Sequence, residues 1–560
     1  MSGPDRVSGP DRVLDEARAW LAQDPDPATS AELAALIASA SNGEPGARAE
    51  LESRFAGRLQ FGTAGLRAEL GAGPMRMNRV VVAQAAAGLA AYLREKITDR
   101  APLVVIGYDG RRNSGVFAHD SAELFAGAGV RTVLLPRLLP TPVLAFAVRR
   151  LGADAGVMVT ASHNPPNDNG YKVYLGGADA GSQIVPPADG EIAAHIARVA
   201  AAPITQLPRS GDIEIAPESL IDDYVAATAA VAPAPESAAG MRWAYTAMHG
   251  VGWETFARVL DAAGYPRPAL TAAQLEPDGT FPTLAFPNPE EPGALDLAFR
   301  TATESGAEFV IAHDPDADRL GVAIPDGEGW RRLTGNEIGL LLGRRAARAA
   351  AGTAGAALAC SLVSSPGLGA IAERYGLDFH ETLTGFKWIS RAPGLVFGFE
   401  EALGYLVNPQ TVRDKDGISA SIALLELAAD ARGEGRTIAD LLDDLTAEIG
   451  VYRDGQVSLR VEDVSLIGRI TAALRAEPPA AFGDVAVVRA DDLAAGGAGL
   501  PAGDVLRYAL ADGSRVIVRP SGTEPKLKVY LDVRGADAAE AEARLAALDA
   551  AVRTLLARLS

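Results

Sequence analysis

The sequence predicts a multidomain α/β protein that ends in a smaller α+β domain. The chain has 560 residues, of which 48% are hydrophobic, so it holds enough apolar material for ~3–5 domains of ordinary size. From about residue 51 onward, apolar stretches of strand length alternate with Ala- and Leu-rich stretches of helical length, which is typical of α/β units with buried strands. After about residue 450 the pattern changes to short alternating strands and one long Ala-rich helix.

This alternation gives the expected elements and their grouping. Two short helices are expected over 14–40, interrupted at 24–27, with a capping box from Thr29 to Glu32. Buried strands are expected at 103–108, 132–135, 156–160, 243–247, 309–313, 357–362 and 395–399, and the long C-terminal helix at 536–559. Ala/Pro-rich and Gly-rich segments favour a division into an N-terminal tail with helices over 1–50, α/β domains over 51–213, 214–330 and 331–450, and an α+β domain over 451–560.

Composition disfavours several classes of protein. A formal net charge of −19 argues against a nucleic-acid partner, because phosphate backbones attract basic surfaces. No apolar run has the length of a membrane span, and the N-terminus, which carries a tandem Ser-Gly-Pro-Asp-Arg-Val copy, lacks the apolar core of a signal peptide. Cys360 is the single cysteine, so we expect no internal disulfide, a buried thiol and a cytoplasmic protein.

A serine-containing loop directly follows one of the expected strands. The loop Thr-Ala-Ser-His-Asn-Pro at 160–165 comes after the strand at 156–160, and α/β sheets place their sites at such strand ends. The Asn-Pro pair keeps the loop out of a helix. The Gly-x-Ser-x-Gly frame of serine hydrolases is missing, which disfavours acyl transfer. Ser162 is therefore a candidate functional residue, with an ordinary polar loop as the alternative.

An acidic triplet follows the strand expected at 309–313. Asp314, Asp316 and Asp318 are spaced by two residues, so their side chains point to one side of an extended backbone. Crowded carboxylates require a cation, and hard oxygen ligands suit Mg²⁺ or Ca²⁺. An EF-hand would have Gly in place of Arg319 and Glu in place of Pro325, so the calcium loop is excluded.

Two further loops offer groups that bind phosphates and sugars. Residues 519–528, Arg-Pro-Ser-Gly-Thr-Glu-Pro-Lys-Leu-Lys, combine a guanidinium, two hydroxyls, a glycine and lysines, a set that matches phosphate geometry. Glu400 and Glu401 end the strand expected at 395–399, where paired carboxylates can accept hydrogen bonds from sugar hydroxyls. The nearby run at 384–387, Thr-Gly-Phe-Lys, adds a hydroxyl and a cation.

A glycine-rich loop at 61–67 ends in Arg67. It has neither the Walker lysine nor a complete Gly-x-Gly-x-x-Gly, so a nucleotide site is not supported.

Together these motifs resemble those of the α-D-phosphohexomutase family, and in particular of phosphoglucomutase/phosphomannomutase, over about 57–530 of the chain. The resemblance implies three similar α/β domains plus a smaller C-terminal α+β domain around a central cleft. It implies an isomerase that relocates a phosphoryl group within a sugar, with Mg²⁺ as cofactor and a sugar 1,6-bisphosphate as intermediate and activator. Small-molecule sugar phosphates would be the partners of a cytoplasmic monomer or homodimer.

The resemblance also implies a role for each matched residue. Ser162 would carry the phosphoryl group and would hold Mg²⁺ together with Asp314, Asp316 and Asp318. Beside it would lie the groups expected to assist transfer, which are Arg67, Arg319, Lys172 as general base and His163 as the alternative base. A lysine base needs a lowered pKa, which nearby arginines and Mg²⁺ would supply. The sugar-binding residues would be Thr384, Gly385, Lys387 and Glu400, and the phosphate-binding residues Arg519, Ser521, Gly522, Thr523 and Lys528.

The sequence favours glucose as the sugar and leaves mannose and pentose as alternatives. Ala402 stands where many family members carry serine, and this form is similar to a subgroup that includes phosphopentomutases and glucose-1,6-bisphosphate synthases. Two functions of other classes are the remote alternatives. One is a phosphatase or phosphotransferase with Asp314 as its nucleophile, and the other is a non-catalytic sugar-phosphate-binding protein.

Overall fold

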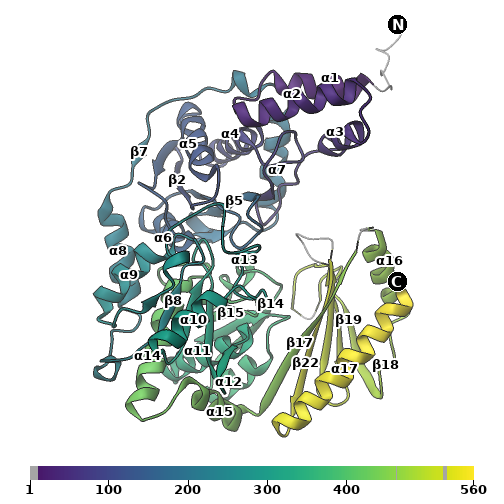
Figure 1. The fold of residues 1–560 in the computed structure, drawn as a ribbon. Helices are drawn as coiled ribbons and strands as arrows, with labels where there is room; N and C mark the ends of the chain where they lie inside the picture. Colours follow the sequence, from purple (N-terminus) through teal and green to yellow (C-terminus); the bar gives the residue numbers. More distant parts are fainter. Residues whose placement is uncertain (1–10, 462, 464, 498, 521–525) are drawn as a thin grey trace. The chain divides into compact units, whose positions relative to one another are not determined.

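The computed structural model describes residues 11–461, 463, 465–497, 499–520 and 526–560. The chain divides into two compact units, which are residues 1–330 with 408–425, and residues 331–407 with 426–560. The segment 408–425 therefore packs with the first unit, although it lies in the middle of the sequence of the second. Each unit contains two sheets (Figure 1).

The first sheet of unit 1 has the strand order β1-β5-β4-β2-β3-β7, with β6 paired to β5. The strands are β1 Leu66–Glu69, β2 Leu103–Tyr108, β3 Arg131–Leu134, β4 Ala155–Val159, β5 Asp168–Leu175, β6 Ser182–Gln183 and β7 Glu214–Ile215. The helices are α1 Asp11–Leu21, α2 Pro27–Ser41, α3 Ala47–Phe55, α4 Arg79–Lys96, α5 Ser114–Gly127, α6 Thr141–Arg150 and α7 Ala188–Val199. The N-terminal helices α1–α3 contact one another, and their apolar side chains join the core of this sheet.

The expected capping box at Thr29 is wrong, because α2 begins two residues earlier. Asp26 is its N-cap and accepts a hydrogen bond from the backbone N–H of Ala28, with Pro27 at the first helical position. Thr29 lies in the first turn and donates its hydroxyl to Asp24 at 2.7 Å. The carboxylate of Glu32 pairs with Arg54 instead of closing a capping box.

The second sheet of unit 1 has the order β12-β11-β10-β8-β9. The strands are β8 Ala244–Thr246, β9 Ala269–Leu270, β10 Val310–His313, β11 Leu320–Asp326 and β12 Gly329–Arg332. The helices are α8 Glu218–Ala229, α9 Gly252–Ala263 and α10 Asp296–Ser305, and the N-terminal half of α14 Gly417–Gly433 also belongs to this unit.

Unit 2 begins with the sheet β14-β13-β15-β16. The strands are β13 Ala357–Ser361, β14 Asp378–Thr382, β15 Leu395–Glu400 and β16 Gly404–Leu406, and the helices are α11 Gly335–Ala350, α12 Gly367–Tyr375, α13 Phe386–Ile389 and α15 Ile438–Ile449. Cys360 lies buried in β13, as expected.

The last sheet is antiparallel throughout, in the order β17-β22-β21-β20-β19-β18. Its strands are β17 Val451–Arg460, β18 Ala481–Phe482, β19 Val485–Asp492, β20 Leu506–Leu510, β21 Arg515–Pro520 and β22 Lys526–Gly535, and its helices are α16 Ser465–Ala476 and α17 Ala538–Leu559. The long helix α17 lies along β17 and β22 (Figure 1). The predicted class, three α/β domains followed by an α+β domain, is confirmed.

The first three sheets share one local arrangement at the point where the predicted loops occur. In each, a strand of the parallel core is followed by an antiparallel neighbour, so the intervening loop is a short hairpin at the carboxyl end of the parallel strands. The three pairs are β4–β5, β10–β11 and β15–β16. These hairpins carry the serine loop, the acidic triplet and the paired glutamates, respectively.

Candidate active site

The serine loop joins β4 to β5 and holds Ser162 in a rare backbone conformation. Ser162 has φ 52°, in the left-handed region that few non-glycine residues adopt, and its side chain is buried. Its backbone N–H donates to the Thr160 hydroxyl at 2.8 Å. An ordinary turn residue requires neither burial nor a strained backbone, so these features favour a functional role for Ser162 over an ordinary polar loop.

The acidic triplet lies in the β10–β11 hairpin and meets Ser162. One carboxylate oxygen from each of Asp314, Asp316 and Asp318 lies within 4.8 Å of the others, and all three side chains are buried. Ser162 Oγ donates to Asp314 Oδ2 at 2.9 Å. The structure thus brings together two motifs that are about 150 residues apart in the sequence.

Two lysines neutralise part of this negative charge. Lys172 Nζ donates to Asp316 Oδ2 at 2.7 Å and to Asp318 Oδ2 at 2.8 Å. Lys415 Nζ lies 3.3 Å from the same oxygen of Asp318. Burial of three carboxylates is tolerable only with such counter-charges.

The remaining carboxylate oxygens fit a hard divalent cation. Asp316 Oδ1 and Asp318 Oδ1 are buried without a hydrogen-bond partner among the described residues. An unsatisfied buried carboxylate oxygen is costly, and oxygen-only donor sets of this kind are those that Mg²⁺ binds. The lysines occupy the Oδ2 atoms and leave the Oδ1 atoms available, so the residues present fit the predicted metal.

The charges in this cluster shift the pKa values in opposite directions. Burial, together with the charge of Asp318, raises the pKa of Asp314 and of Asp316. Burial also acts to raise the pKa of Asp318, but Lys172, Lys415 and Arg319 outweigh it and lower that pKa. Asp318 is therefore the carboxylate that the protein itself holds most firmly in the ionised form.

The two candidate bases differ in both position and charge. His163 Nδ1 lies 3.2 Å from Ser162 Oγ, and burial with nearby Arg319 and Arg67 holds the pKa of His163 well below its usual value. Burial lowers the pKa of Lys172, but Asp316 and Asp318 outweigh burial and raise it. The expected lowering for Lys172 is therefore absent in this arrangement, and of the two candidate bases only His163 has a described contact with the serine hydroxyl.

Both predicted arginines lie beside the cluster. Arg319 donates its backbone N–H to Asp314 Oδ1 at 3.0 Å, and its Nε lies 3.7 Å from Asp318 Oδ1. Arg67 Nη1 donates to Asn164 Oδ1 at 3.2 Å. Arg67 follows Gly65, whose φ of 74° and close approach to the carbonyl of Tyr171 leave no room for a Cβ atom.

Several residues of this site were not found from the sequence. The segment 408–425 brings Lys415 to Asp318, and its Asp414 accepts hydrogen bonds from Tyr174 at 2.8 Å and from Gln183 at 2.8 Å. Thr141 donates to Asp316 at 2.6 Å. The charged run Arg-Asp-Lys-Asp-Gly at 413–417, just before a helix, is the signal that could have marked Lys415.

In unit 2 the two glutamates of the β15–β16 hairpin have different surroundings. Glu401 Oε2 accepts hydrogen bonds from Ser361 at 3.2 Å and Ser364 at 3.0 Å, and its backbone N–H donates to Ser364 Oγ. Glu401 thereby anchors the hairpin. Glu400 is half-buried at the end of β15 and contributes to the electrostatic surroundings of Tyr530.

The described part of the predicted phosphate loop contains Arg519, Lys526 and Lys528, of which Arg519 and Lys528 are predicted phosphate-binding residues. Arg519 on β21 lies directly opposite Lys528 on β22, and Arg519 hydrogen-bonds the hydroxyl of Tyr530. Cross-strand neighbours of like charge repel each other, and a bound anion would relieve this. Ser521, Gly522 and Thr523 lie outside the described residues. Of the other sugar-binding candidates, Thr384 and Gly385 follow β14, and Lys387 lies in α13.

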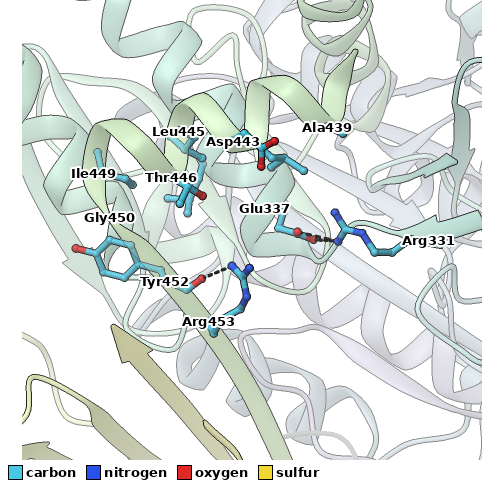
Figure 2. Close-up of a pocket in the computed structure, with 12 residues that line it drawn as sticks. Arg331, Glu337, Ala439, Asp443, Leu445, Thr446, Ile449, Gly450, Tyr452 and Arg453 are labelled. Atoms are coloured by element: carbon cyan, nitrogen blue, oxygen red, sulfur yellow. Dashed lines mark hydrogen bonds and ion pairs between the residues drawn. The ribbon is translucent and has the colours of Figure 1, made fainter. Parts of the chain in front are cut away.

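Unit 2 also contains a cavity of about 150 Å³ between α11, α15 and the start of β17 (Figure 2). Arg331 pairs with Glu337 at 2.8 Å on one wall, and Arg453 donates to the Tyr452 carbonyl at 3.0 Å on another. None of the predicted site residues lines this cavity, so its lining residues differ from those of the loops described above.

Solved structures share this fold. A phosphoglucomutase/phosphomannomutase family protein from Burkholderia thailandensis is 21% identical, with a TM-score of 0.68, and the match covers 89% of this chain and 97% of that one. The Paramecium phosphoglucomutase parafusin, in its open form, is 17% identical, with a TM-score of 0.66 and coverage of 90% and 96%. The fold is therefore that of the phosphohexomutases.

Sequence comparisons then identify the family. The chain belongs to the phosphoglucomutase/phosphomannomutase family, because the models of its α/β/α domains I, II and III match 58–202, 222–327 and 334–449, and that of its C-terminal domain matches 471–550. Members of this family are mutases, so the protein is an isomerase.

Individual relatives carry different sugar names. A Haemophilus influenzae protein named probable phosphomannomutase is 54% identical over 86% of this chain and 98% of its own length. A Mus musculus phosphopentomutase is 34% identical over 94% and 92%, and a Staphylococcus epidermidis phosphoglucomutase is 34% identical over 85% and 90%. No helix among the described residues is both long and apolar enough to cross a membrane.

Proposed function

We propose that the protein interconverts glucose 1-phosphate and glucose 6-phosphate through a phosphoserine at Ser162 and a glucose 1,6-bisphosphate intermediate. The observation that carries this proposal is the 2.9 Å hydrogen bond from the buried Ser162 hydroxyl to Asp314, inside a cluster of three carboxylates. A serine held beside a candidate metal site is placed for phosphoryl transfer rather than for acyl transfer.

The proposed reaction consists of two phosphoryl transfers, and in each one O–P bond replaces another. The Oγ–P bond of phosphorylated Ser162 breaks as a sugar hydroxyl forms a new O–P bond, and the hydroxyl proton passes to a base. The bisphosphate then reorients, its other O–P bond breaks as Ser162 Oγ forms a new O–P bond, the base takes the serine proton, and the released sugar oxygen takes up a proton. The atoms near Ser162 that can exchange protons are His163 Nδ1, at 3.2 Å from Oγ, and Lys172 Nζ, which is bound to Asp316 and Asp318.

Charge stabilisation is assigned to the rest of the unit 1 site. Asp314, Asp316, Asp318 and Ser162 would hold Mg²⁺, which when bound supplies positive charge to the transferred phosphoryl oxygens. Arg319 and Arg67 add fixed positive charge beside the same loop. Because phosphoserine carries roughly −1.5 to −2 charges, these cations stabilise the phosphorylated form more than the free serine.

Substrate binding is assigned to unit 2. Glu400, with Thr384, Gly385 and Lys387, would hold the sugar hydroxyls, and Arg519 and Lys528, with Ser521, Gly522 and Thr523, would hold the phosphate that is not transferred. The cross-strand pair of Arg519 and Lys528 supports this assignment. These groups must accept the bisphosphate in both orientations. A cytoplasmic location and a monomeric or dimeric state remain predictions.

The test of this mechanism is labelling by glucose 1,6-bisphosphate carrying a radioactive phosphoryl group, in the presence of Mg²⁺. We expect stable label on Ser162 that survives hydroxylamine. A hydroxylamine-labile label on Asp314 would instead favour the aspartate-nucleophile phosphotransferase. No label and no turnover with any sugar phosphate would favour the binding protein.

A pentose phosphate is the second candidate substrate. Ala402 removes a hydroxyl from the sugar loop, and phosphopentomutases are among the relatives that match nearly the whole chain. The relative named as a phosphomannomutase keeps mannose in the comparison. Values of kcat/KM for the 1-phosphates of glucose, mannose and ribose, measured with the corresponding bisphosphate and Mg²⁺, decide among the three. A kcat/KM for ribose 1-phosphate above that for glucose 1-phosphate would replace glucose in the proposal.

A further inference from the structure

One buried side chain outside the predicted site makes an unusual set of contacts with the serine loop. The guanidinium of Arg111 donates to three backbone carbonyl oxygens of this loop and to the carbonyl oxygen of the first residue of β5. The acceptors are Ser162 O at 2.5 Å, Asn164 O at 2.6 Å, Pro165 O at 2.9 Å and Asp168 O at 3.1 Å. A single side chain therefore bonds four backbone carbonyl oxygens over residues 162–168.

The sheet explains how Arg111 reaches these oxygens. Arg111 follows β2, and β2 is the parallel neighbour of β4, with Tyr108 opposite Val159. Parallel strands bring their carboxyl ends to the same edge, so the loop after β2 lies beside the serine loop. The sequence alone does not predict this contact, because Arg111 and Ser162 are about 50 residues apart in the chain.

The guanidinium is held rigidly from its other sides. Arg111 is only 4% exposed, its Nε lies 3.7 Å from Asp109 Oδ2, and the ring of Phe281 packs 4.9 Å from its central carbon. The loop has a second support in the hydroxyl of Thr160, which accepts the backbone N–H of Ser162 at 2.8 Å.

The serine loop needs such support because its backbone is strained. Ser162 has φ 52°, and the loop contains the two consecutive prolines Pro165 and Pro166, which provide no N–H donors. Pro165 O also accepts the backbone N–H of Asp168 at 3.0 Å, but no other described donor is bound to Ser162 O or Asn164 O, so loss of Arg111 would leave the loop freer to relax. The planar guanidinium presents its donors in a fixed fork, whereas a lysine ammonium offers three donors from one point.

We propose that Arg111 is a positioning residue, which holds the serine loop so that Ser162 Oγ faces Asp314. This inference rests on the proposed phosphoserine function and adds to it a residue that touches neither the substrate nor the reacting oxygen. A displacement of about 1 Å at a reacting group can cost ~10²-fold in rate, so loss of this support should be visible in the phosphorylation step itself.

The experiment compares Arg111→Lys with Arg112→Lys in the full chain. Arg112 is the matched control, because it is the exposed neighbour whose side chain donates to the Asn167 side chain, at 2.6 Å, and to none of the four carbonyl oxygens. In the presence of Mg²⁺, the rate at which radioactive glucose 1,6-bisphosphate labels Ser162 is measured by rapid quench. The kcat, KM and Tm of each protein are measured as well. We expect Arg111→Lys to lower the labelling rate and kcat on the order of 10²-fold. The KM for glucose 1-phosphate should change by no more than about threefold, and Arg112→Lys should match the wild type.

A second variant protects the test against a simple loss of folding. In Arg111→Ala, added guanidinium ion should restore part of the labelling rate, whereas the same concentration of ammonium should not. A wild-type labelling rate in folded Arg111→Lys, or a rise in KM with kcat unchanged, would overturn the inference while leaving the phosphoserine mechanism intact. Unfolding of both Arg111 variants without rescue would show a general structural role instead. Absence of label on the wild type would remove the inference together with the mechanism.

Discussion

The predicted site loops of unit 1 and those of unit 2 are built on similar hairpins but differ in how their charges are satisfied. In unit 1, the three carboxylates are buried and are paired with Ser162, Lys172, Lys415 and Arg319. In unit 2, Arg519 and Lys528 face each other across two strands without an ion pair to any described residue. The contrast indicates that the buried charges of unit 1 are paired within the protein, whereas a bound anion would relieve the repulsion between Arg519 and Lys528.

This difference bears on the question of the sugar. A preorganised phosphoryl-transfer centre is the same for any sugar phosphate, so it defines the class of reaction but not the substrate. The sugar loop differs from that of many family members at Ala402, and the relatives carry three different sugar names. Substitutions in unit 1 should therefore change kcat for every sugar, whereas substitutions in unit 2 should change KM and the ranking of sugars.

The largest expected effect is that of Ser162→Ala. Removal of the proposed nucleophile should lower turnover on the order of 10⁴-fold with each sugar phosphate, because the covalent route is lost. The fold should persist, since only the hydroxyl is removed. Turnover is measured by a coupled assay, with Ser305→Ala on the exposed side of α10 as control. Turnover of Ser162→Ala within tenfold of the wild type would refute the mechanism.

Removal of the metal should have the next largest effect. Chelation should lower turnover on the order of 10³-fold, and Mg²⁺ should restore it and raise Tm, because ligand binding to the native state stabilises it. In Asp316→Asn the gain in Tm with Mg²⁺ should be largely lost, since one orphaned carboxylate oxygen is replaced. Asp326→Asn, at the exposed end of β11, is the control. An unchanged Mg²⁺ response in Asp316→Asn would exclude the triplet as the metal site.

Arg519→Met tests the residues of unit 2 that are assigned to substrate binding. Hydrogen bonds to charged groups contribute ~1.5–3 kcal/mol, so KM for the sugar phosphate should rise about 10–100-fold while kcat falls much less. Arg489→Met, exposed on β19 of the same sheet, is the control. A fall in kcat with KM unchanged would place Arg519 in the chemical step and would remove the distinction between the units.

The sequence predicted the loops of the site better than the framework that holds them. Ser162, the acidic triplet, Arg319 and Lys172 were recognisable because each lies in a short motif next to an apolar strand. Arg111 and Lys415 were missed because their importance depends on neighbouring strands and on the segment 408–425, which packs with a unit formed mainly by earlier residues. No pattern in the sequence shows that the ammonium of Lys172 is bound by two aspartates, whose charges raise its pKa in this structure.

The remaining expected effect concerns stability and lies in unit 2. Burial raises the pKa of Asp532 to about 7, Arg515 at 2.6 Å acts to lower it, and the facing carboxylates of Asp454 and Glu401 raise it. A carboxyl whose pKa is higher in the folded state binds its proton more tightly there than in the unfolded chain, where the value is near 3.8. Its contribution to the unfolding free energy is therefore greatest below about pH 4 and declines as the pH rises towards 7.

Asp532→Asn should remove this decline. Between pH 4.5 and 7.5 the wild type should lose about 3 kcal/mol relative to the variant, measured as the pH dependence of urea unfolding of unit 2 in the full chain. Asp549→Asn, at a half-buried position of α17 where the carboxylate pairs with Arg553, should keep the wild-type slope. Identical slopes for the wild type and Asp532→Asn would mean that Arg515 holds Asp532 ionised across the whole range. Both units would then contain fully paired buried charges, and their difference would be confined to the loops that bind substrate.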